Sequence, residues 1–232
     1  MALNLAVLYS GGKDSNFALY EVVRRGDDVT CLITLRPADE ESMLFHYPNV
    51  KLTVLQAESL KLPLLAYDIS AGEDELYMMS ELVGRAKREY GIEGIVTGGL
   101  KSVYQRDRFE SVCRLHQIKG INPLWNMNEV VYLRCLMASG FKILITRVAA
   151  EGLGPEWLGV ELDAARVERL IALATTKGFN ASFEGGEGET FVLDMPLFEK
   201  QIVVLKSERT WDKGAGTLNI IKATLRDKAT HV

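Results

Sequence analysis

The sequence is poor in the side chains that bind metals or form disulfides. Among 232 residues there are only three cysteines and three histidines. The cysteines are far apart, and no pair has the Cys-x-x-Cys spacing of a zinc site. The sequence therefore suggests neither a disulfide framework nor a zinc site, and Cys113 and His116, three residues apart on an expected helix, are too few ligands to make a metal site. We interpret Cys31, Cys113 and Cys135 as buried thiols in a reducing compartment.

Long apolar runs and a surplus of positive charge are also missing. No segment approaches the roughly 20 apolar residues of a membrane-spanning helix, and the first residues lack the charged segment of a signal peptide. The formal net charge is −4, whereas nucleic acid attracts a basic surface. We therefore expect a cytoplasmic protein with no membrane or direct nucleic-acid partner; whether it forms a homo-oligomer is left open.

What the first half of the chain does contain is an alternation of strand and helix patterns. Short apolar runs at 3–9, 28–35, 63–69 and 92–99 predict buried strands, and helical spacing occurs at 15–26, 50–62 and 73–91. Repeated strand–helix–strand units imply a parallel sheet with helices on both faces. The sequence thus predicts an α/β fold.

Beyond about residue 120 the pattern loosens. Helices are predicted at 129–140 and 162–178, and strands at 141–148, 190–195, 200–209 and 216–226. The last two strands predict an antiparallel hairpin with its turn at 212–216. We expect a nucleotide-binding domain over 1–120 and a smaller C-terminal α+β lobe over 121–232, tightly packed on it.

A glycine-rich segment lies between the first predicted strand and the first predicted helix. It is not a Walker A loop, because Val7 stands at the first glycine position and an aspartate follows the lysine. A glycine turn and a helix N-terminus nevertheless attract anions, and the lysine can neutralise a phosphate. The aspartate suits Mg²⁺ or a helix cap. An ordinary capped turn would not require all these polar residues, so we favour a phosphate site formed by Ser10, Gly11, Gly12, Lys13, Asp14 and Ser15.

A second candidate segment follows the fourth predicted strand. Ligands of open α/β sheets bind at the carboxyl ends of strands, where the strand order reverses. If the first and fourth strands are neighbours, Gly98 and Gly99 face the same crevice and let a nucleotide approach the backbone. Arg106 or Arg108 could then hold the α-phosphate, although a polar helix start at the surface is an equal alternative. The side chains expected at this mouth are Tyr104, Gln105, Arg106 and Arg108.

An acidic segment, FEGGEGETFVLD, occupies residues 183–194. Its carboxylates Glu184, Glu187 and Glu189 lie between glycines and repel one another unless a positive group relieves them. Mg²⁺, an arginine and a cationic substrate are the candidates, and a solvated loop is the alternative. We favour a binding site.

The segment SGGKDS resembles the PP-loop of the ATP pyrophosphatases. This resemblance implies an adenine nucleotide alpha hydrolase-like fold in which the loop grips the pyrophosphate of ATP, released as PPi while AMP is transferred to a substrate. Together with the charges of the side chains, it leads us to expect catalytic roles for Lys13, Asp14 and Arg106, with Mg²⁺ at Asp14.

Most of the chain is similar to the diphthine–ammonia ligases in their archaeal single-domain form. The matching segments are SGGKDS, SMLFHYPN at 42–49, GGLKSVYQR at 98–106, NPLW at 122–125, GLGPEWLGVELD at 152–163 and EGGEGET at 184–190. The resemblance implies ATP-dependent amidation of diphthine on translation elongation factor 2 by ammonia, through an acyl-adenylate. The three glutamates would then hold the trimethylammonium and imidazole of diphthine, with Phe183 and Phe191 beside them.

Two other functions stay open at this point. A PP-loop tRNA-modifying enzyme would need catalytic cysteines or a basic RNA surface. A non-catalytic ATP-binding regulator would bind nucleotide without producing PPi.

Overall fold

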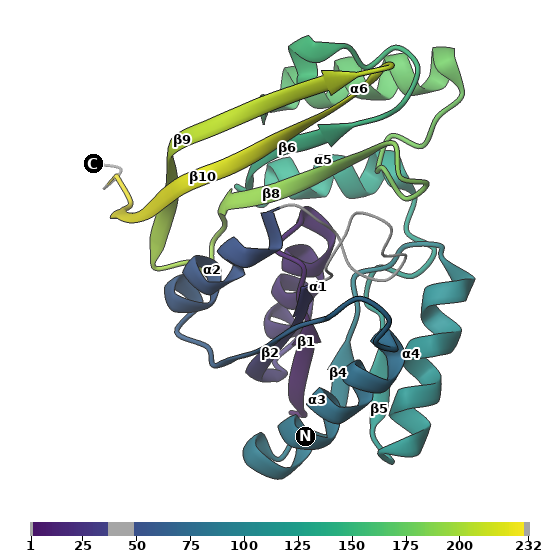
Figure 1. The fold of residues 1–232 in the computed structure, drawn as a ribbon, viewed down its shortest axis with the longest axis vertical. Helices are drawn as coiled ribbons and strands as arrows, with labels where there is room; N and C mark the ends of the chain where they lie inside the picture. Colours follow the sequence, from purple (N-terminus) through teal and green to yellow (C-terminus); the bar gives the residue numbers. More distant parts are fainter. Residues whose placement is uncertain (1, 37–48, 230–232) are drawn as a thin grey trace. The chain divides into compact units, whose positions relative to one another are not determined.

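The fold in Figure 1 is a computed structural model that describes residues 2–36 and 49–229. The chain divides into two compact units, Met1–Asn126 and Met127–Val232, and each is described by itself below. Of the segment SMLFHYPN, residues 42–48 lie outside the described residues. A search of the described helices finds none long and apolar enough to cross a membrane.

The N-terminal unit is built on a five-stranded sheet in which all strands are parallel. Its strand order is β3-β2-β1-β4-β5. The strands are short and mostly apolar, as expected where both faces of a sheet are covered. They are β1 (Asn4–Leu8), β2 (Asp28–Arg36), β3 (Leu64–Asp68), β4 (Gly94–Val96) and β5 (Lys119–Ile121). The predicted α/β class is confirmed, while β5 was not predicted.

Helices cover both faces of this sheet (Figure 1). They are α1 (Lys13–Arg24), α2 (Thr53–Leu60, preceded by the 3₁₀ turn Asn49–Leu52), α3 (Glu75–Tyr90) and α4 (Val103–Leu115). The apolar residues of α3 and α4 share one core cluster with Ala6 and Leu8 of β1. Helix α1 contacts β1 and β2, and right-handed crossovers place it on the opposite face. The sheet is therefore wound in both directions from β1.

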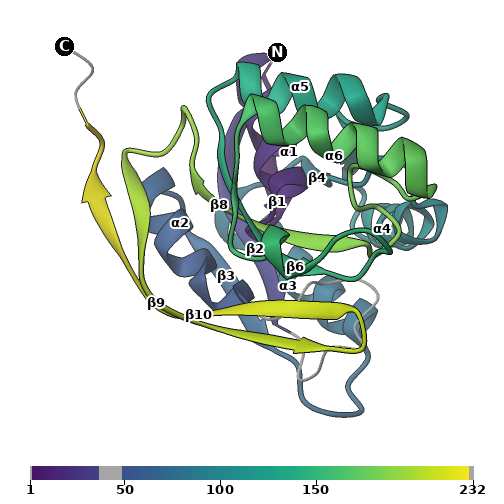
Figure 2. The same cartoon turned by 90° about the horizontal axis from the view of Figure 1, so that it is seen from above.

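The C-terminal unit contains an antiparallel sheet with the order β7-β6-β10-β9, and β8 pairs with β6. Its elements are α5 (Glu129–Ala138), β6 (Lys142–Val148), the 3₁₀ turn Pro155–Trp157, β7 (Glu161–Leu162), α6 (Ala164–Lys177), β8 (Gly188–Asp194), β9 (Lys200–Asp212) and β10 (Ala215–Asp227). Helices α5 and α6 lie side by side (Figure 2). Arg134 joins them by donating two hydrogen bonds to the carboxylate of Glu168, at 2.7 and 2.8 Å. The predicted α+β lobe is confirmed.

The last two strands form the predicted antiparallel hairpin. Its turn consists of Lys213 and Gly214, which both have positive φ angles of 46° and 85°, as a two-residue hairpin turn of type I′ requires. The pairing is irregular between Ile220 and Ala223, where first β10 and then β9 carries an extra residue. The two extra residues, Ile221 and Leu205, are 52% and 50% exposed.

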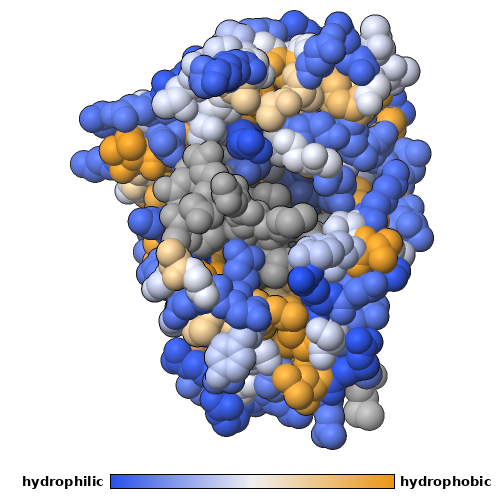
Figure 3. Space-filling model, turned by 45° about the vertical axis from the view of Figure 1, so that its right-hand side comes forward, coloured by the Kyte–Doolittle hydropathy of each residue, from blue (hydrophilic) through white to orange (hydrophobic). Residues whose placement is uncertain are grey.

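The surface carries its exposed apolar side chains in scattered positions. On the face shown in Figure 3, the described apolar residues lie in small groups separated by hydrophilic ones. Among the residues that the structure describes, the apolar side chains on this face therefore do not form a single large patch.

Candidate active site

The glycine-rich loop lies where the strand order of the N-terminal sheet reverses. Strand β1 pairs with β2 on one side and with β4 on the other, and Val7 is aligned with Val96. The carboxyl ends of β1 and β4 are therefore neighbours, as the sequence hypothesis required. In open α/β sheets this edge is the usual place for a ligand.

The loop turns at Gly11, whose φ of +83° is a conformation that favours glycine. Helix α1 begins at Lys13, with Gly12 as its N-cap residue and no side chain capping its first N–H groups. Such first-turn N–H groups have no carbonyl partner inside the helix, and together with the helix dipole they favour an anion. The loop thus has the local geometry of a phosphate site.

The loop carbonyls are held by buried side chains. Gln56 Nε2 donates to the Gly11 carbonyl at 3.0 Å, and Asn16 Nδ2 donates to the Gly12 carbonyl at 2.9 Å. The hydroxyl of Ser15 also donates to the Gly12 carbonyl, at 3.2 Å, and lies 3.3 Å from the hydroxyl of Ser10. Gln56 and Asn16 are both 0% exposed. Because the oxygens of these carbonyls accept hydrogen bonds from protein donors, their partial negative charge does not face an incoming anion.

Asn16 is itself fixed by a buried tyrosine. The Tyr9 hydroxyl donates to Asn16 Oδ1 at 2.5 Å, and the Tyr9 carbonyl accepts from Thr34 Oγ1 at 2.6 Å. Burial raises the pKa of the Tyr9 phenol well above its usual value, so the hydroxyl remains a donor at neutral pH. Sequence reasoning missed Tyr9, Asn16 and Gln56. Asn16 directly follows SGGKDS, but nothing in the sequence marks Gln56.

Lys13 and Asp14 form an ion pair at the start of α1. Lys13 Nζ donates to the two carboxylate oxygens of Asp14 at 3.0 and 2.9 Å. The lysine side chain is only 3% exposed, whereas that of Asp14 is 29% exposed. The structure therefore presents a buried cation and a more accessible carboxylate together at a helix N-terminus.

Gly98, which follows β4, packs directly against this helix start. A Cβ atom at Gly98 would lie 2.6 Å from the Asp14 carbonyl carbon and 2.8 Å from the Ser15 nitrogen. Gly98 is thus explained by a close approach of two backbone segments, whereas the sequence hypothesis explained it by a close approach of nucleotide. Its neighbour Gly99 continues the same loop, and both follow the strand beside β1.

The other predicted residues of this crevice lie in the first turns of α4. Arg106 donates to Asp107 Oδ1 at 3.1 and 3.2 Å, and its guanidinium lies 4.6 Å from the ring centre of Trp125. Arg108 lies over the ring of Tyr104, at 3.9 Å from its centre. Gln105 belongs to the same helix. The arginines are thus positioned by aromatic rings and carboxylates of their own unit.

A search of residues 2–36 and 49–229 finds no group of three or more His, Cys, Asp and Glu side chains that could hold a metal ion. Asp14 supplies a partly exposed carboxylate beside the loop. Mg²⁺ commonly uses one or two carboxylates together with phosphate oxygens and water. Asp14 therefore fits a magnesium ion that arrives with a nucleotide, rather than one bound by protein alone.

The acidic segment at 183–194, called the acidic loop below, belongs to the C-terminal unit and continues into β8. Glu187 folds back into it: Oε1 accepts from the Asn180 N–H at 3.0 Å, and Oε2 accepts from the Gly185 N–H at 2.8 Å. Glu189 lies on β8 with Oε1 at 4.0 Å from Arg147 Nη1. Glu184 is half-buried. The three carboxylates therefore differ in their surroundings, and Glu187 stabilises the loop itself.

The two phenylalanines that flank the glutamates of the acidic loop are buried. Phe183 is 5% and Phe191 is 1% exposed. A Cβ atom at Gly188 would lie 3.0 Å from the Phe183 ring, so this ring packs against the start of β8. Both rings therefore pack against other residues of the protein.

Two of the three cysteines have the properties of inert core thiols. Burial raises the pKa of Cys31 from 9.0 to about 11, and that of Cys113 to about 11 as well. Both thiols therefore stay protonated at neutral pH and are poor nucleophiles.

Fold and loop together define a doubly wound α/β unit, with a glycine-rich loop at its strand-order reversal, joined to an α+β unit. Family models narrow this class: residues 3–120 match the diphthamide synthase N-terminal domain, and residues 122–225 match the diphthamide synthase C-terminal domain. The chain belongs to the diphthamide synthase family.

Curated relatives agree with this assignment. The chain is 34% identical to the human diphthine–ammonia ligase over 226 residues, which cover 89% of this chain and 84% of the human protein. The mouse protein of the same name is 35% identical over 228 residues, with the same coverage. The protein of that name from Schizosaccharomyces pombe is 34% identical and matches 95% of this chain, but only 39% of its own length.

Among solved structures, the chain is similar to a predicted subunit of tRNA methyltransferase from Methanocaldococcus jannaschii. The identity is 18% and the TM-score 0.42, with 84% of this chain and 98% of that chain covered. A likeness this weak carries no functional argument.

Proposed function

We propose that this chain catalyses the ATP-dependent amidation of diphthine on elongation factor 2, with ammonia as nitrogen donor and AMP and PPi as products. The observation that carries the proposal is that diphthamide synthase models match both units. The phosphate-binding geometry of residues 10–15 supports the use of ATP. In this proposal the N-terminal domain over 1–120 binds ATP and the lobe over 121–232 faces the modified side chain.

The first step is the attack of a diphthine carboxylate oxygen on the α-phosphorus of ATP. A bond forms between this oxygen and the phosphorus, the bond to the pyrophosphate breaks, and acyl-adenylate and PPi result. The first N–H groups of α1 and the buried ammonium of Lys13 would stabilise the charge that develops on the leaving pyrophosphate. Gly11, Gly12, Ser10 and Ser15 form the rest of this cradle.

Mg²⁺ at Asp14 would neutralise phosphate charge when the nucleotide is bound. Without nucleotide, Lys13 holds the Asp14 carboxylate beside the loop, because its Nζ donates to both carboxylate oxygens at 2.9 and 3.0 Å. Arg106 is our candidate for the α-phosphate. It would have to exchange its contact with Asp107 for the nucleotide, while Trp125 continues to support the guanidinium. Gly98 and Gly99, with Tyr104 and Gln105, complete the proposed nucleotide site.

In the second step ammonia attacks the acyl carbon of the adenylate. The new carbon–nitrogen bond replaces the carbon–oxygen bond to AMP, the nitrogen loses a proton, and AMP leaves with one oxygen from the original carboxylate. The protonated state of Cys31 and Cys113 gives no support to a thiol-based reaction such as tRNA thiolation.

The glutamates of the acidic loop are our candidates for binding the cationic diphthine side chain. Glu184 and Glu189 would supply negative charge directly. Glu187 would act mainly by holding the loop, because both its oxygens accept backbone N–H groups. We expect Glu184→Gln or Glu189→Gln to raise the KM for diphthine-bearing elongation factor by about tenfold or more, with little change for ATP. Separate titrations of nucleotide and protein substrate check this; loss of ATP–Mg²⁺ affinity alone would favour a metal role instead.

The test of the proposed function is incubation with diphthine-bearing elongation factor 2, ATP, Mg²⁺ and ammonium. Mass spectrometry should show conversion of the carboxylate to the amide, together with AMP and PPi. Reactions without ammonium, or with elongation factor that lacks diphthine, serve as controls. ATP binding with no PPi would point to a regulator, and ADP with phosphate as main products would contradict the proposed chemistry.

A further inference from the structure

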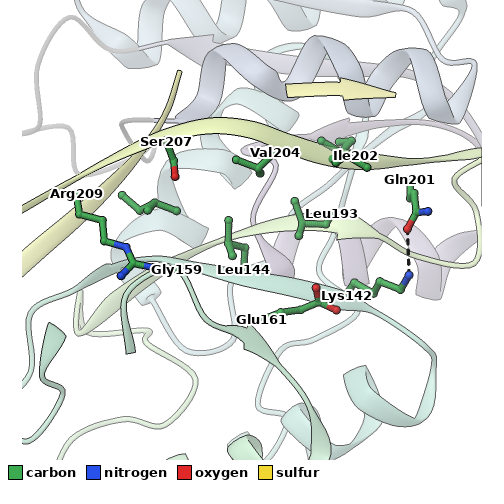
Figure 4. A pocket seen from close by; sticks show the side chains of 12 residues that line it. Lys142, Leu144, Gly159, Glu161, Leu193, Gln201, Ile202, Val204, Ser207 and Arg209 are labelled. Atoms are coloured by element: carbon green, nitrogen blue, oxygen red, sulfur yellow. Dashed lines mark hydrogen bonds between the residues drawn. The ribbon is translucent and has the colours of Figure 1, made fainter. Parts of the chain in front are cut away.

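The C-terminal unit contains a pocket of about 310 Å³ that none of the roles above uses. Side chains of β9 face side chains of β6 and β8 across it (Figure 4). Its central part is aliphatic and is lined by Leu144, Leu193, Ile202, Val204 and Leu218. This volume is near the lower end of the roughly 300–1,000 Å³ of ligand sites. It suits one apolar side chain of a partner better than a large cofactor.

Charged groups stand at the ends of this aliphatic pocket. Arg209 lies at one end beside Gly159 (Figure 4), where a Cβ atom would come within 2.8 Å of Arg209 Nη2. Because Gly159 has no side chain, the guanidinium can lie directly against its backbone. In the described part of the chain, the side chain of Arg209 has no ion-pair partner. An exposed guanidinium at the end of an apolar pocket is suited to bind a carboxylate.

The opposite end of the pocket is closed by a hydrogen bond. Lys142 Nζ donates to Gln201 Oε1 at 3.1 Å, and Glu161 lies close by (Figure 4). The lysine is also 3.8 Å from Asp194. The positive charge of Lys142 at this end is therefore already neutralised by protein groups. At the opposite end, the positive charge of Arg209 is available to a ligand.

The hairpin that carries Arg209 is basic although the chain has a net charge of −4. Residues 200–227 contain more basic than acidic side chains. The acidic ones are Glu208, Asp212 and Asp227, and the basic ones are Lys200, Lys206, Arg209, Lys213, Lys222 and Arg226. Strand β9 is also at the end of the sheet order. An edge strand beside a pocket is the arrangement with which proteins bind extended segments of a partner. Charge complementarity favours an acidic segment.

We propose that this pocket anchors the protein substrate. An apolar side chain from an extended acidic segment of elongation factor 2 enters the pocket, and a neighbouring carboxylate of that segment pairs with Arg209. The inference rests on the proposed function, in which the reacting side chain is part of a large protein. A contact away from the modified residue supplies binding energy that the small diphthine side chain cannot supply alone.

Two exposed residues that line the pocket allow a test with matched controls. Arg209→Glu reverses the charge at the pocket, and Lys206→Glu makes the same reversal elsewhere on β9, outside the lining. Ser207→Trp fills the pocket from its rim, and Thr210→Trp adds the same bulk outside it. Circular dichroism and thermal melting establish that each variant folds.

The KM for diphthine-bearing elongation factor 2, the KM for ATP and kcat are measured for each variant. Direct binding of the same factor is measured by interferometry without ATP, so that this arm needs no turnover. We expect Arg209→Glu and Ser207→Trp to weaken factor binding and raise its KM by about tenfold or more. The KM for ATP and kcat should stay within about threefold, and both control variants should resemble the parent.

Equal losses in Arg209→Glu and Lys206→Glu would show general charge attraction and overturn the pocket assignment, as would full binding by both pocket variants. Binding that disappears after nuclease treatment would assign the hairpin to nucleic acid. A change from dimer to monomer in light scattering would assign the pocket to a second copy of this chain. If the parent binds the factor but forms no amide, the proposed function fails while the binding arm still decides on the pocket.

Discussion

The close approach of Gly98 to the start of α1 gives the sharpest test of the nucleotide site. In Gly98→Ala, the new Cβ atom would lie 2.6 Å from the Asp14 carbonyl carbon, 2.7 Å from its oxygen and 2.8 Å from the Ser15 nitrogen. All three are backbone atoms, so no change of rotamer relieves the contact. Either the loop after β4 or the first turn of α1 must move.

The cost of this movement can be bounded from general experience of overpacking, which is about 1–3 kcal/mol. For a chain of this size, each kcal/mol lowers the Tm by about 2–4 °C. We therefore expect Gly98→Ala to lower the Tm by roughly 4–8 °C for a central cost of about 2 kcal/mol. Because the phosphate site moves with α1, kcat/KM for ATP should fall by about ten- to a hundredfold.

Gly120→Ala is the matched control. Gly120 lies in β5 of the same sheet, and a Cβ atom there would meet only Cys113 Sγ at 3.5 Å and Glu110 Cγ at 3.9 Å, which are ordinary contacts. Its Tm and ATP kinetics should stay close to those of the parent. If Gly98→Ala loses ATP affinity at an unchanged Tm, the glycine serves nucleotide approach and the backbone-contact explanation is wrong. Unchanged Tm and unchanged ATP kinetics would refute both explanations.

Three further predictions concern the same unit. Lys13→Ala and Asp14→Ala should each lower kcat/KM for ATP by about 10²-fold or more, measured by PPi release, and near-parental rates for both would reduce the loop to a simple turn. Gln56→Leu removes the donor to the Gly11 carbonyl; calorimetry should show a loss of about 1–3 kcal/mol in the free energy of unfolding and weaker ATP binding, and unchanged values would contradict the positioning role. Since burial raises the pKa of Cys31 and Cys113 to about 11, the folded state retains protons that the unfolded state loses above pH 9. Stability from these thiols should thus be complete below pH 9 and decline up to pH 11, and denaturant titrations of the double alanine variant should show a smaller decline.

The sequence predicted the main elements of the N-terminal unit because its strands are apolar runs and its helices have clear ends. Helix α3 is an example: Asp74 caps it by accepting from the N–H groups of Leu76 and Tyr77, and Gly91 ends it with a positive φ. The hypothesis of a nucleotide site required the first and fourth strands to be neighbours, and the structure confirms that β1 pairs with β4. Strand β5 was missed, since three residues, Lys119–Ile121, are too few to give a pattern.

The parts that could not be predicted depend on contacts between distant residues. Gln56 binds the Gly11 carbonyl across 45 positions of sequence, and no local pattern reports such a contact. The reason for Gly98 is likewise a backbone segment far away in sequence. The hairpin was predicted from two strand-like runs separated by a turn, but its two extra residues, Leu205 and Ile221, follow from the strand pairing alone. Site roles depend on bound substrates, so those of Lys13 and the glutamates remain predictions.

The most direct test of the account is to follow one oxygen atom through the reaction. Elongation factor 2 whose diphthine carboxylate is enriched in a heavy oxygen isotope is incubated with the chain, ATP, Mg²⁺ and ammonium, and the nucleotide products are analysed by mass spectrometry. Reaction through an acyl-adenylate predicts AMP that carries heavy oxygen, formed in equal amount to the amide. Heavy oxygen in inorganic phosphate with ADP as the nucleotide product, or amide formation with unlabelled AMP, would contradict it.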